Sequence, residues 1–248
     1  MPRSDLQDGK ARKAHLSILY WLRRAGRGLL DLLYPPRCVA CGQMGVLYCG
    51  VCRESVTRVT APVCSLCGKS IPAPGLCPHC VNHPLDIDGI RSVAVFGGSL
   101  RKAIHHFKYR HSRQMAEPLG EMLVRFWQQT PLVAEAIVPV PLHARRLRER
   151  GYNQSMLLAQ QLERAAGLPI LSGVLHRTKY TVSQTHLDGD QRRQNVAGAF
   201  VCREGVKDKS VLLVDDVCTT GATLEASSMA LKAGGAKSVW ALTLARAQ

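Results

Sequence analysis

The sequence contains no apolar run long enough to span a bilayer, which takes about 20 consecutive, mostly apolar residues. Residues 14–34 come nearest, but four charged residues interrupt them: Arg23, Arg24, Arg27 and Asp31. The same segment lacks the small-residue cleavage site of a secretory signal. We therefore expect a cytoplasmic protein whose residues 1–37 form an amphipathic helical segment. Its apolar face is expected to pack on the protein body, with contact at a membrane surface as the alternative.

Acidic residues are also scarce. The 248 residues include 33 lysines and arginines against 18 aspartates and glutamates, which gives a formal net charge of +15. Such an excess predicts an acidic partner, whether nucleic acid, a phosphorylated metabolite or an anionic membrane, and does not choose among them. A chain of this length accommodates two domains, or one domain with an appendage.

The most informative stretch is VLLVDDVCTTGATL, residues 211–224. Four apolar residues predict a buried strand, two adjacent acids follow it, and a turn of small and hydroxyl residues precedes a helical pattern that begins at Leu224. Free backbone N–H groups and the positive end of a helix dipole make such a turn an anion site. Gly221 permits close approach of the backbone, and the threonine hydroxyls add hydrogen-bond donors.

Paired acids beside a phosphate cradle indicate a ligand with hydroxyl groups next to its phosphate, because carboxylates accept hydrogen bonds from vicinal diols. The stretch resembles the phosphoribosyl pyrophosphate (PRPP) motif of type I phosphoribosyltransferases. The resemblance implies that Asp215 and Asp216 hold the ribose hydroxyls. It also implies that the loop binds the 5-phosphate through Thr219, Thr220, Gly221, Ala222 and Thr223. An ordinary strand, turn and helix is the alternative interpretation.

Eight of the ten cysteines lie between positions 38 and 80 as four CxxC pairs. A CxxC turn points two thiolates at one ion and two turns complete a tetrahedral site, so the pattern predicts two structural zinc ions. In a cytoplasmic chain this spacing favours zinc over disulfides. Sequential pairing gives a first cysteine set of Cys38, Cys41, Cys49 and Cys52, and a second cysteine set of Cys64, Cys67, Cys77 and Cys80. A cross-braced arrangement of the same pairs is the alternative.

Residues 100–109 follow helical spacing, with basic residues on one side and aromatic residues among them. Bases stack on aromatic rings while lysine and arginine contact phosphates, so this surface suits single-stranded nucleic acid. The candidate DNA contacts are Arg101, Lys102, Lys108, Tyr109 and Arg110. A solvated basic helix face is the competing interpretation.

Two other segments carry candidate ligand contacts. The turn after the predicted strand 136–141 brings arginines to the strand's carboxyl end, the edge at which open α/β sheets bind ligands. Guanidinium forks suit pyrophosphate, and the phosphoribosyltransferase resemblance assigns Arg145 and Arg146 to it. Residues 176–198 form a long polar loop, and in the resembled enzymes a flexible loop closes over PRPP. That resemblance makes Arg177 and Lys179 candidate catalytic cations, with a plain solvated loop as the equal alternative.

The whole arrangement resembles the ComF family of competence proteins, including its GntX branch. The match rests on the PRPP motif and on the stretches LLYPPRCVACG, VPVPLHARRLRERGYNQS and RTKYTVSQTHLDGDQRRQNVAGAF. Alternating strand and helix patterns predict an α/β fold with a parallel sheet. The resemblance implies an N-terminal double zinc ribbon over residues 38–84, with four cysteines per zinc, and a type I phosphoribosyltransferase-like domain over residues 85–248.

The same resemblance implies Mg²⁺ bound with PRPP, and single-stranded DNA handled during DNA uptake, natural transformation or use of external DNA. It also implies other DNA-uptake proteins as partners, such as a ComF-operon helicase. An active phosphoribosyltransferase that moves ribose 5-phosphate to an unidentified nitrogen base is the alternative function. Purine-type enzymes of the resembled group place an acid at the position of Thr219 to move a base proton, which threonine cannot do at neutral pH. Purine salvage is therefore disfavoured.

Overall fold

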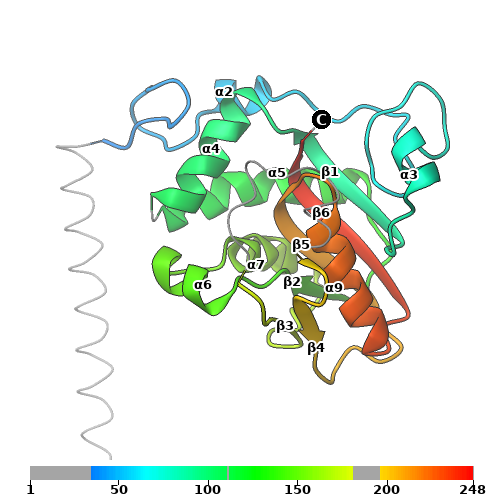
Figure 1. Ribbon diagram of the computed structural model, residues 1–248. Helices are drawn as coiled ribbons and strands as arrows, with labels where there is room; N and C mark the ends of the chain where they lie inside the picture. The colour runs from blue at the N-terminus through cyan, green and yellow to red at the C-terminus, as the bar shows by residue number, and fades with distance from the viewer. Residues whose placement is uncertain (1–34, 111, 181–195, 248) are drawn as a thin grey trace, which may run out of the picture. The chain divides into compact units, whose positions relative to one another are not determined.

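The computed structural model describes residues 35–110, 112–180 and 196–247. The chain divides into two compact units, of which the first ends at Cys49 and the second begins at Gly50. Every helix and strand labelled in Figure 1 lies in the second unit. The predicted N-terminal helical segment lies outside the described residues.

A four-stranded parallel sheet forms the centre of the second unit, with strand order β1-β6-β5-β2. Residues Val211 to Val214 of the middle strand β5 are fully buried. Continuous apolar strands of this kind are typical of parallel sheets covered on both faces. The predicted parallel α/β sheet is therefore confirmed, and its strands are β1 (Gly89–Val95), β2 (Ala136–Pro139), β5 (Ser210–Cys218) and β6 (Ser238–Arg246).

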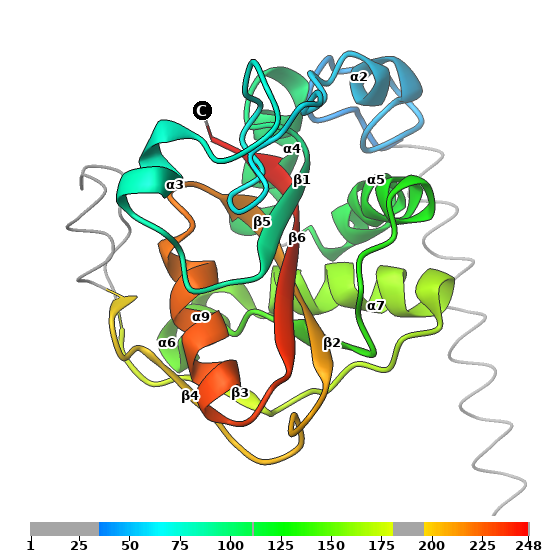
Figure 2. The same ribbon diagram turned by 90° about the vertical axis from the view of Figure 1, so that its right-hand side faces the viewer.

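Helices cover both faces of this sheet (Figure 2). Helices α5 (Ala116–Gln129) and α7 (Gln154–Ala166) pack on one another and on one face, whereas α9 (Ala222–Ala233) lies on the other face. Apolar side chains at three- and four-residue spacing, such as Leu119, Met122 and Leu123 of α5, supply the buried stripe of each helix. The remaining helices are α2 (Gly50–Glu54), α3 (Pro78–Asn82), α4 (Gly98–Tyr109), the 3₁₀ turn η1 (Arg113–Met115) and α6 (Ala144–Arg150).

A short antiparallel hairpin borders the predicted polar loop. Strand β3 (Leu175–Arg177) pairs with β4 (Phe200–Cys202), so the predicted loop begins inside β3 and ends just before β4. Residues 181–195, the middle of that loop, lie outside the described residues. The lid that the sequence predicts there remains a prediction.

The second cysteine set belongs to the hydrophobic core of the α/β unit. Its four sulfur-bearing residues are at most 4% exposed and cluster with Leu85, Ile87 and Ile90 around the sheet. The backbone N–H of Ile90 donates to the Leu66 carbonyl at 2.8 Å, which joins this set to strand β1. The cysteines therefore form part of the structure that positions the sheet.

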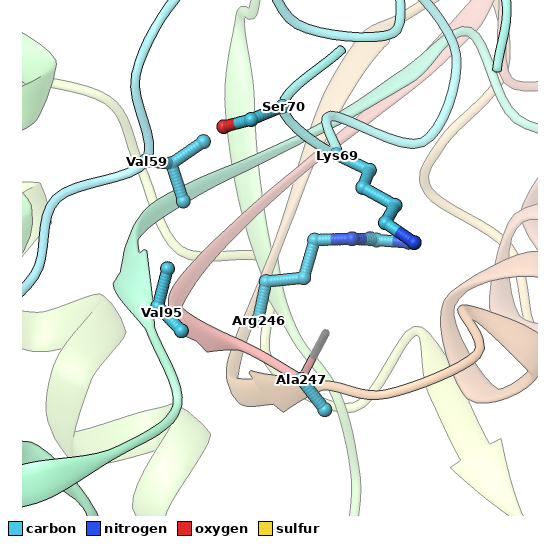
Figure 3. A pocket seen from close by; sticks show the side chains of 6 residues that line it. All are labelled: Val59, Lys69, Ser70, Val95, Arg246 and Ala247. Carbon is cyan, nitrogen blue, oxygen red and sulfur yellow. The ribbon is translucent and has the colours of Figure 1, made fainter.

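Arg246, the last residue of β6, links the same cysteine set to the end of β5. Its Nη1 donates to the Cys67 carbonyl at 2.6 Å and to the Cys218 sulfur at 3.0 Å. Arg246 is buried and also lines a pocket at this end of the sheet, together with Val59, Lys69, Ser70, Val95 and Ala247 (Figure 3).

The part of the chain that the structure describes contains no helix with the length and the apolar character needed to cross a membrane.

Candidate functional site

The two adjacent acids lie near the carboxyl end of β5, in the middle of the sheet. The strand continues through Asp215 and Asp216 to Cys218, so the acids belong to the strand instead of following it as the sequence pattern predicts. The turn then passes through Gly221, whose φ of +92° is in the left-handed region, and α9 begins at Ala222. A Cβ on Gly221 would lie 3.2 Å from a methyl group of Leu85. The turn therefore requires glycine for its backbone conformation and for its close packing.

The amino end of α9 faces this turn without a side-chain cap. Gly221 at the N-cap position has no side chain that could accept from the first N–H groups of the helix. The backbone N–H of Ala222 donates to the Thr220 hydroxyl at 3.4 Å. Donors at a helix amino end can hold an anionic oxygen. The acids on β5 and the donors at the start of α9 thus follow one another along the chain.

A lysine and a serine from two different helices hold the acid pair. Lys108 of α4 places its Nζ 2.7 Å from Asp216 Oδ1, and the Asp216 side chain is 7% exposed. Asp215 Oδ1 accepts from the Ser155 hydroxyl of α7 at 2.8 Å and from the backbone N–H of Asp216 at 2.9 Å. A hydroxyl donor already occupies one oxygen of Asp215. Asp215 thus already accepts a hydrogen bond from a hydroxyl group in the ligand-free protein.

Burial and the neighbouring charge of Asp216 raise the pKa of Asp215 to about 6. The ammonium of Lys108 and the hydrogen bond from Ser155 oppose this rise. Near neutral pH the pair therefore loses or gains a proton easily, because two carboxylates so close together resist double ionisation. A ligand that donates hydrogen bonds to both acids stabilises their ionised form.

Lys108 reaches the acid pair because the last turn of α4 is held against the start of α7. The Tyr152 hydroxyl donates to the Phe107 carbonyl at 2.5 Å, and the Gln154 amide donates to the same carbonyl at 3.5 Å. The Phe107 ring is fully buried and lies 5.8 Å from the Tyr152 ring. The sequence analysis groups Lys108 with exposed DNA contacts, whereas the structure directs its charge to Asp216.

The other candidate DNA contacts lie on the exposed side of α4. Tyr109 is 57% exposed, and its ring lies 4.8 Å from the His105 ring and 5.4 Å from the guanidinium of Arg150. The sequence analysis did not select Arg150, although it stands in the arginine-rich segment. The remaining candidates are also exposed: Arg101, Lys102 and Arg110.

The arginines predicted for pyrophosphate lie on the short helix α6, where the sequence analysis expected a turn. Arg145 donates to Glu149 at 2.9 Å, and its guanidinium lies 4.8 Å from the Tyr180 ring centre. Arg146, the second of these arginines, affects the pKa of Arg177 through its charge. Burial and the charge of Arg146 lower the pKa of Arg177, while the charge of Asp215 raises it.

The charge interaction between Arg177 and Asp215 links Arg177 to the acid pair, and Arg146 acts on Arg177. Arg177 also lies over the Phe200 ring, 5.3 Å from its centre. The other candidate loop cation, Lys179, donates to the Ala197 carbonyl at 3.0 Å. Among the four predicted cations, Arg177 therefore has a charge that interacts with Asp215.

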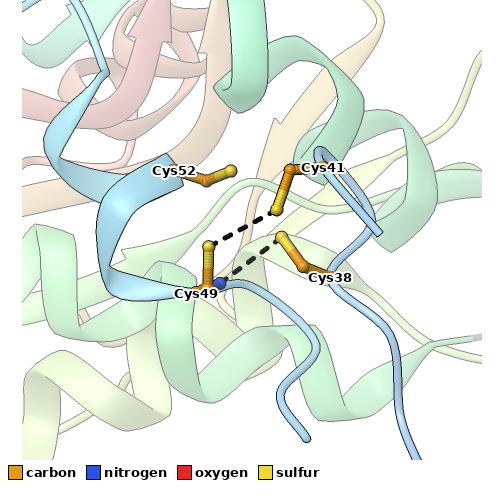
Figure 4. A group of neighbouring side chains, drawn as sticks. All are labelled: Cys38, Cys41, Cys49 and Cys52. Atoms are coloured by element: carbon orange, nitrogen blue, oxygen red, sulfur yellow. Dashed lines mark hydrogen bonds between the residues drawn. The ribbon is translucent and has the colours of Figure 1, made fainter. Parts of the chain in front are cut away.

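Each cysteine set forms a cluster in which all four sulfur atoms lie within 4.8 Å of one another. The Sγ atoms of Cys41 and Cys49 are 3.7 Å apart (Figure 4), as are those of Cys67 and Cys77. Four thiolates at the usual zinc–sulfur distance of about 2.3 Å would be separated by about 3.8 Å at the corners of a tetrahedron. Both clusters therefore fit zinc. The sequential pairing is confirmed, and the cross-braced alternative is wrong.

Backbone donors prepare the first cysteine of each set to act as a thiolate. Burial alone would raise the pKa of Cys64, but backbone N–H groups, foremost that of Cys77, lower it to about 6. Cys38 follows the same pattern with Cys49, and its pKa is also lowered to about 6. The thiolate is the form that binds zinc. Cys218 differs, because burial raises its pKa to about 11.

Comparisons with known proteins agree with this arrangement. A family model described as a double zinc ribbon domain matches residues 29–81, and a phosphoribosyl transferase domain model matches residues 148–248. "Competence protein F" of Haemophilus influenzae is 33% identical over 222 residues, which cover 85% of this chain and 97% of that protein. The chain belongs to the ComF family.

Two further members of the ComF family show the same breadth of match. "DNA utilization protein YhgH" of Escherichia coli (strain K12) is 32% identical over 212 residues, which cover 82% of this chain and 92% of that protein. "Competence protein ComFC" of Bacillus subtilis (strain 168) is 28% identical over 206 residues, which cover 80% and 83%. The predicted family and the predicted fold, a phosphoribosyltransferase-like domain with a double zinc ribbon, are confirmed.

Proposed function

We propose that this ComF-family protein binds PRPP together with Mg²⁺ and handles single-stranded DNA in the cytoplasm during DNA uptake or the use of external DNA. The observation that carries the sugar site is the acid pair on β5, followed at once by the uncapped start of α9. The ribose hydroxyls donate to Asp215 and Asp216, and the 5-phosphate accepts from the loop Thr219–Thr223. Arg146 and Arg177 attract the pyrophosphate. Mg²⁺ would bind together with PRPP and would supply positive charge to the pyrophosphate, as suits a cation that keeps few protein ligands.

The DNA part of the proposal rests on the surface of α4 and on the relatives. Related proteins carry the names competence protein and DNA utilization protein. The exposed Tyr109 ring, flanked by His105 and Arg150, offers a stacking platform beside cations. Sequence-tolerant binding of single strands uses this combination. Lys108 faces Asp216, so it contributes less to DNA binding than the other candidates on α4.

Two triple variants with equal charge loss test the DNA surface. R101Q/K102Q/R110Q removes three exposed charges, two near the start of α4 and one just after its end, whereas K207Q/K209Q/K237Q removes three exposed charges that precede β5 and β6. Each phosphate contact to a single strand contributes about 0.7 to the slope of log affinity against log salt. The first variant should lower that slope for oligo-dT by about 2, and the second should leave it near the wild-type value. Equal losses in both variants would show that net charge, and not the α4 surface, governs binding.

An active phosphoribosyltransferase remains the second candidate function, because the same site would hold PRPP for transfer. Thr219 argues against a purine acceptor, since it cannot move a base proton at neutral pH. Incubation of the protein with labelled PRPP and Mg²⁺ separates the two functions. Pyrophosphate release that depends on an added base supports the transferase. Retention of intact PRPP together with single-stranded DNA supports the handling role, and absence of PRPP binding refutes both.

A further inference from the structure

We propose that Lys108 is the resident counter-ion of the Asp215–Asp216 pair and a positioning residue for sugar phosphates, so that ribose 5-phosphate binds without a divalent metal. The inference rests on the proposed PRPP site. It adds a residue from outside the PRPP motif, on α4, more than one hundred positions earlier in the chain. The evidence is the contact of 2.7 Å between Lys108 Nζ and Asp216 Oδ1.

The charges around the pair leave one main role for Lys108. Strand β5 contributes two carboxyls and the buried thiol of Cys218, and α7 contributes the neutral hydroxyl of Ser155. Two cations act on these acids: Lys108 in direct contact with Asp216, and Arg177 through its charge interaction with Asp215. Among the described residues, Lys108 is the one that forms an ion pair with the acids. Without it, two adjacent carboxylates would repel one another and any phosphorylated ligand.

The contact is also preorganised. The Lys108 side chain is 23% exposed, and the turn that bears it is tied to α7 through hydrogen bonds from Tyr152 and Gln154 to the Phe107 carbonyl. A charge-assisted bond made by a pre-positioned donor loses little side-chain freedom. The ammonium is therefore in place before a ligand arrives. A metal ion in the same role would have to arrive together with the ligand.

A resident ammonium changes what the pair demands of its ligand. A sugar hydroxyl donates most strongly to an ionised carboxylate, and the charge of Lys108 favours ionisation of Asp215. PRPP carries a pyrophosphate that chelates Mg²⁺, whereas ribose 5-phosphate does not. With Lys108 supplying the positive charge, the ribose contact to the pair is complete in metal-free conditions.

Titration calorimetry with ribose 5-phosphate tests this role in buffer depleted of Mg²⁺ over a chelating resin. We expect K108M to bind about tenfold more weakly than the wild type, the effect of one lost charge-assisted contact. K108R should recover part of the loss, and added Mg²⁺ should improve K108M more than the wild type. K237M, the same substitution at an exposed lysine just before β6, serves as the control and should bind as the wild type does. Equal or tighter binding by K108M would overturn the proposal.

A second measurement separates failure of this inference from failure of the sugar site. If the wild type binds no ribose 5-phosphate with or without Mg²⁺, the proposed function fails. The counter-ion role is then read from carbon-13 NMR titration of the aspartate carboxyls in the ligand-free protein. Loss of the ammonium should raise the apparent pKa of the pair in K108M, and K108R should restore it. An unchanged titration curve would overturn the role of Lys108, whatever the ligand result.

Discussion

Matched substitutions in the two cysteine sets should have very different effects on stability. Cys49 and Cys77 occupy the same place in their sets, and each donates its backbone N–H to the first cysteine's sulfur, at 3.5 and 3.4 Å. The second set lies in the hydrophobic core of the α/β unit, whereas Cys49 ends the other compact unit. Cys77→Ser should therefore destabilise the α/β unit, and Cys49→Ser should leave it folded.

The size of the effect follows from burial. In Cys77→Ser the three remaining thiols of the set are 0, 2 and 1% exposed, so water cannot replace the lost metal contacts. Arg246, which donates to the Cys67 carbonyl, loses the negative cluster beside its buried guanidinium. An uncompensated buried charge costs about 3–5 kcal/mol. At about 2–4 °C per kcal/mol for a unit of this size, the melting temperature should fall by roughly 6–20 °C.

Differential scanning calorimetry of the two variants, with zinc content measured on the same samples, provides the assay. Both variants should lose one of two zinc ions, because structural zinc sites need all four ligands. The main unfolding transition should move only in Cys77→Ser. Equal shifts in both variants, or an unchanged transition in Cys77→Ser after loss of its zinc, would refute the reasoning.

Three more predictions concern the sheet edge and the α4 surface. Because the pKa of Asp215 is raised to about 6, the folded ligand-free protein binds a proton that the unfolded chain releases near its ordinary pKa, 3.8. Stability should therefore fall by about 2 kcal/mol as the pH rises from about 4 to 7, and denaturant unfolding of Asp215→Asn should lack this part of the slope. Gly221→Val should cost about 1–3 kcal/mol in thermal unfolding and abolish PRPP binding, because φ is +92° and Leu85 is close. Tyr109→Leu should weaken oligo-dT binding in a fluorescence anisotropy titration by about 1–3 kcal/mol, and Tyr109→Phe should retain it.

Local patterns predict the sheet and its motif well. The middle strand β5 contains the predicted apolar residues Val211 to Val214, because a short continuous apolar run is typical of a strand buried on both faces. Helix α9 begins two residues before the predicted start, since Gly221 adopts the left-handed turn that the helix pattern alone does not reveal. The cysteine spacing predicts both clusters, because a CxxC turn already brings two sulfurs together.

Long-range contacts account for what the sequence analysis missed. Lys108 follows Ile104 by four residues and adjoins Phe107, so it lies at the edge of the buried face of α4. Helical spacing places it there, but only the hydrogen bonds from Tyr152 and Gln154 to the end of α4 direct it to Asp216. Arg246 likewise depends on partners far away in the chain, at Cys67 and Cys218. The hairpin β3–β4 has strands of three residues, which are too short to show a period.

Titration calorimetry with PRPP and Mg²⁺ tests the central claim most directly. The wild type should bind one PRPP per chain, and the double variant D215N/D216N, which keeps the shape of both side chains, should show no measurable binding. Its zinc content and melting temperature should show that the fold is intact. Wild-type affinity in a correctly folded D215N/D216N variant would contradict the assignment of the two acids to the ribose.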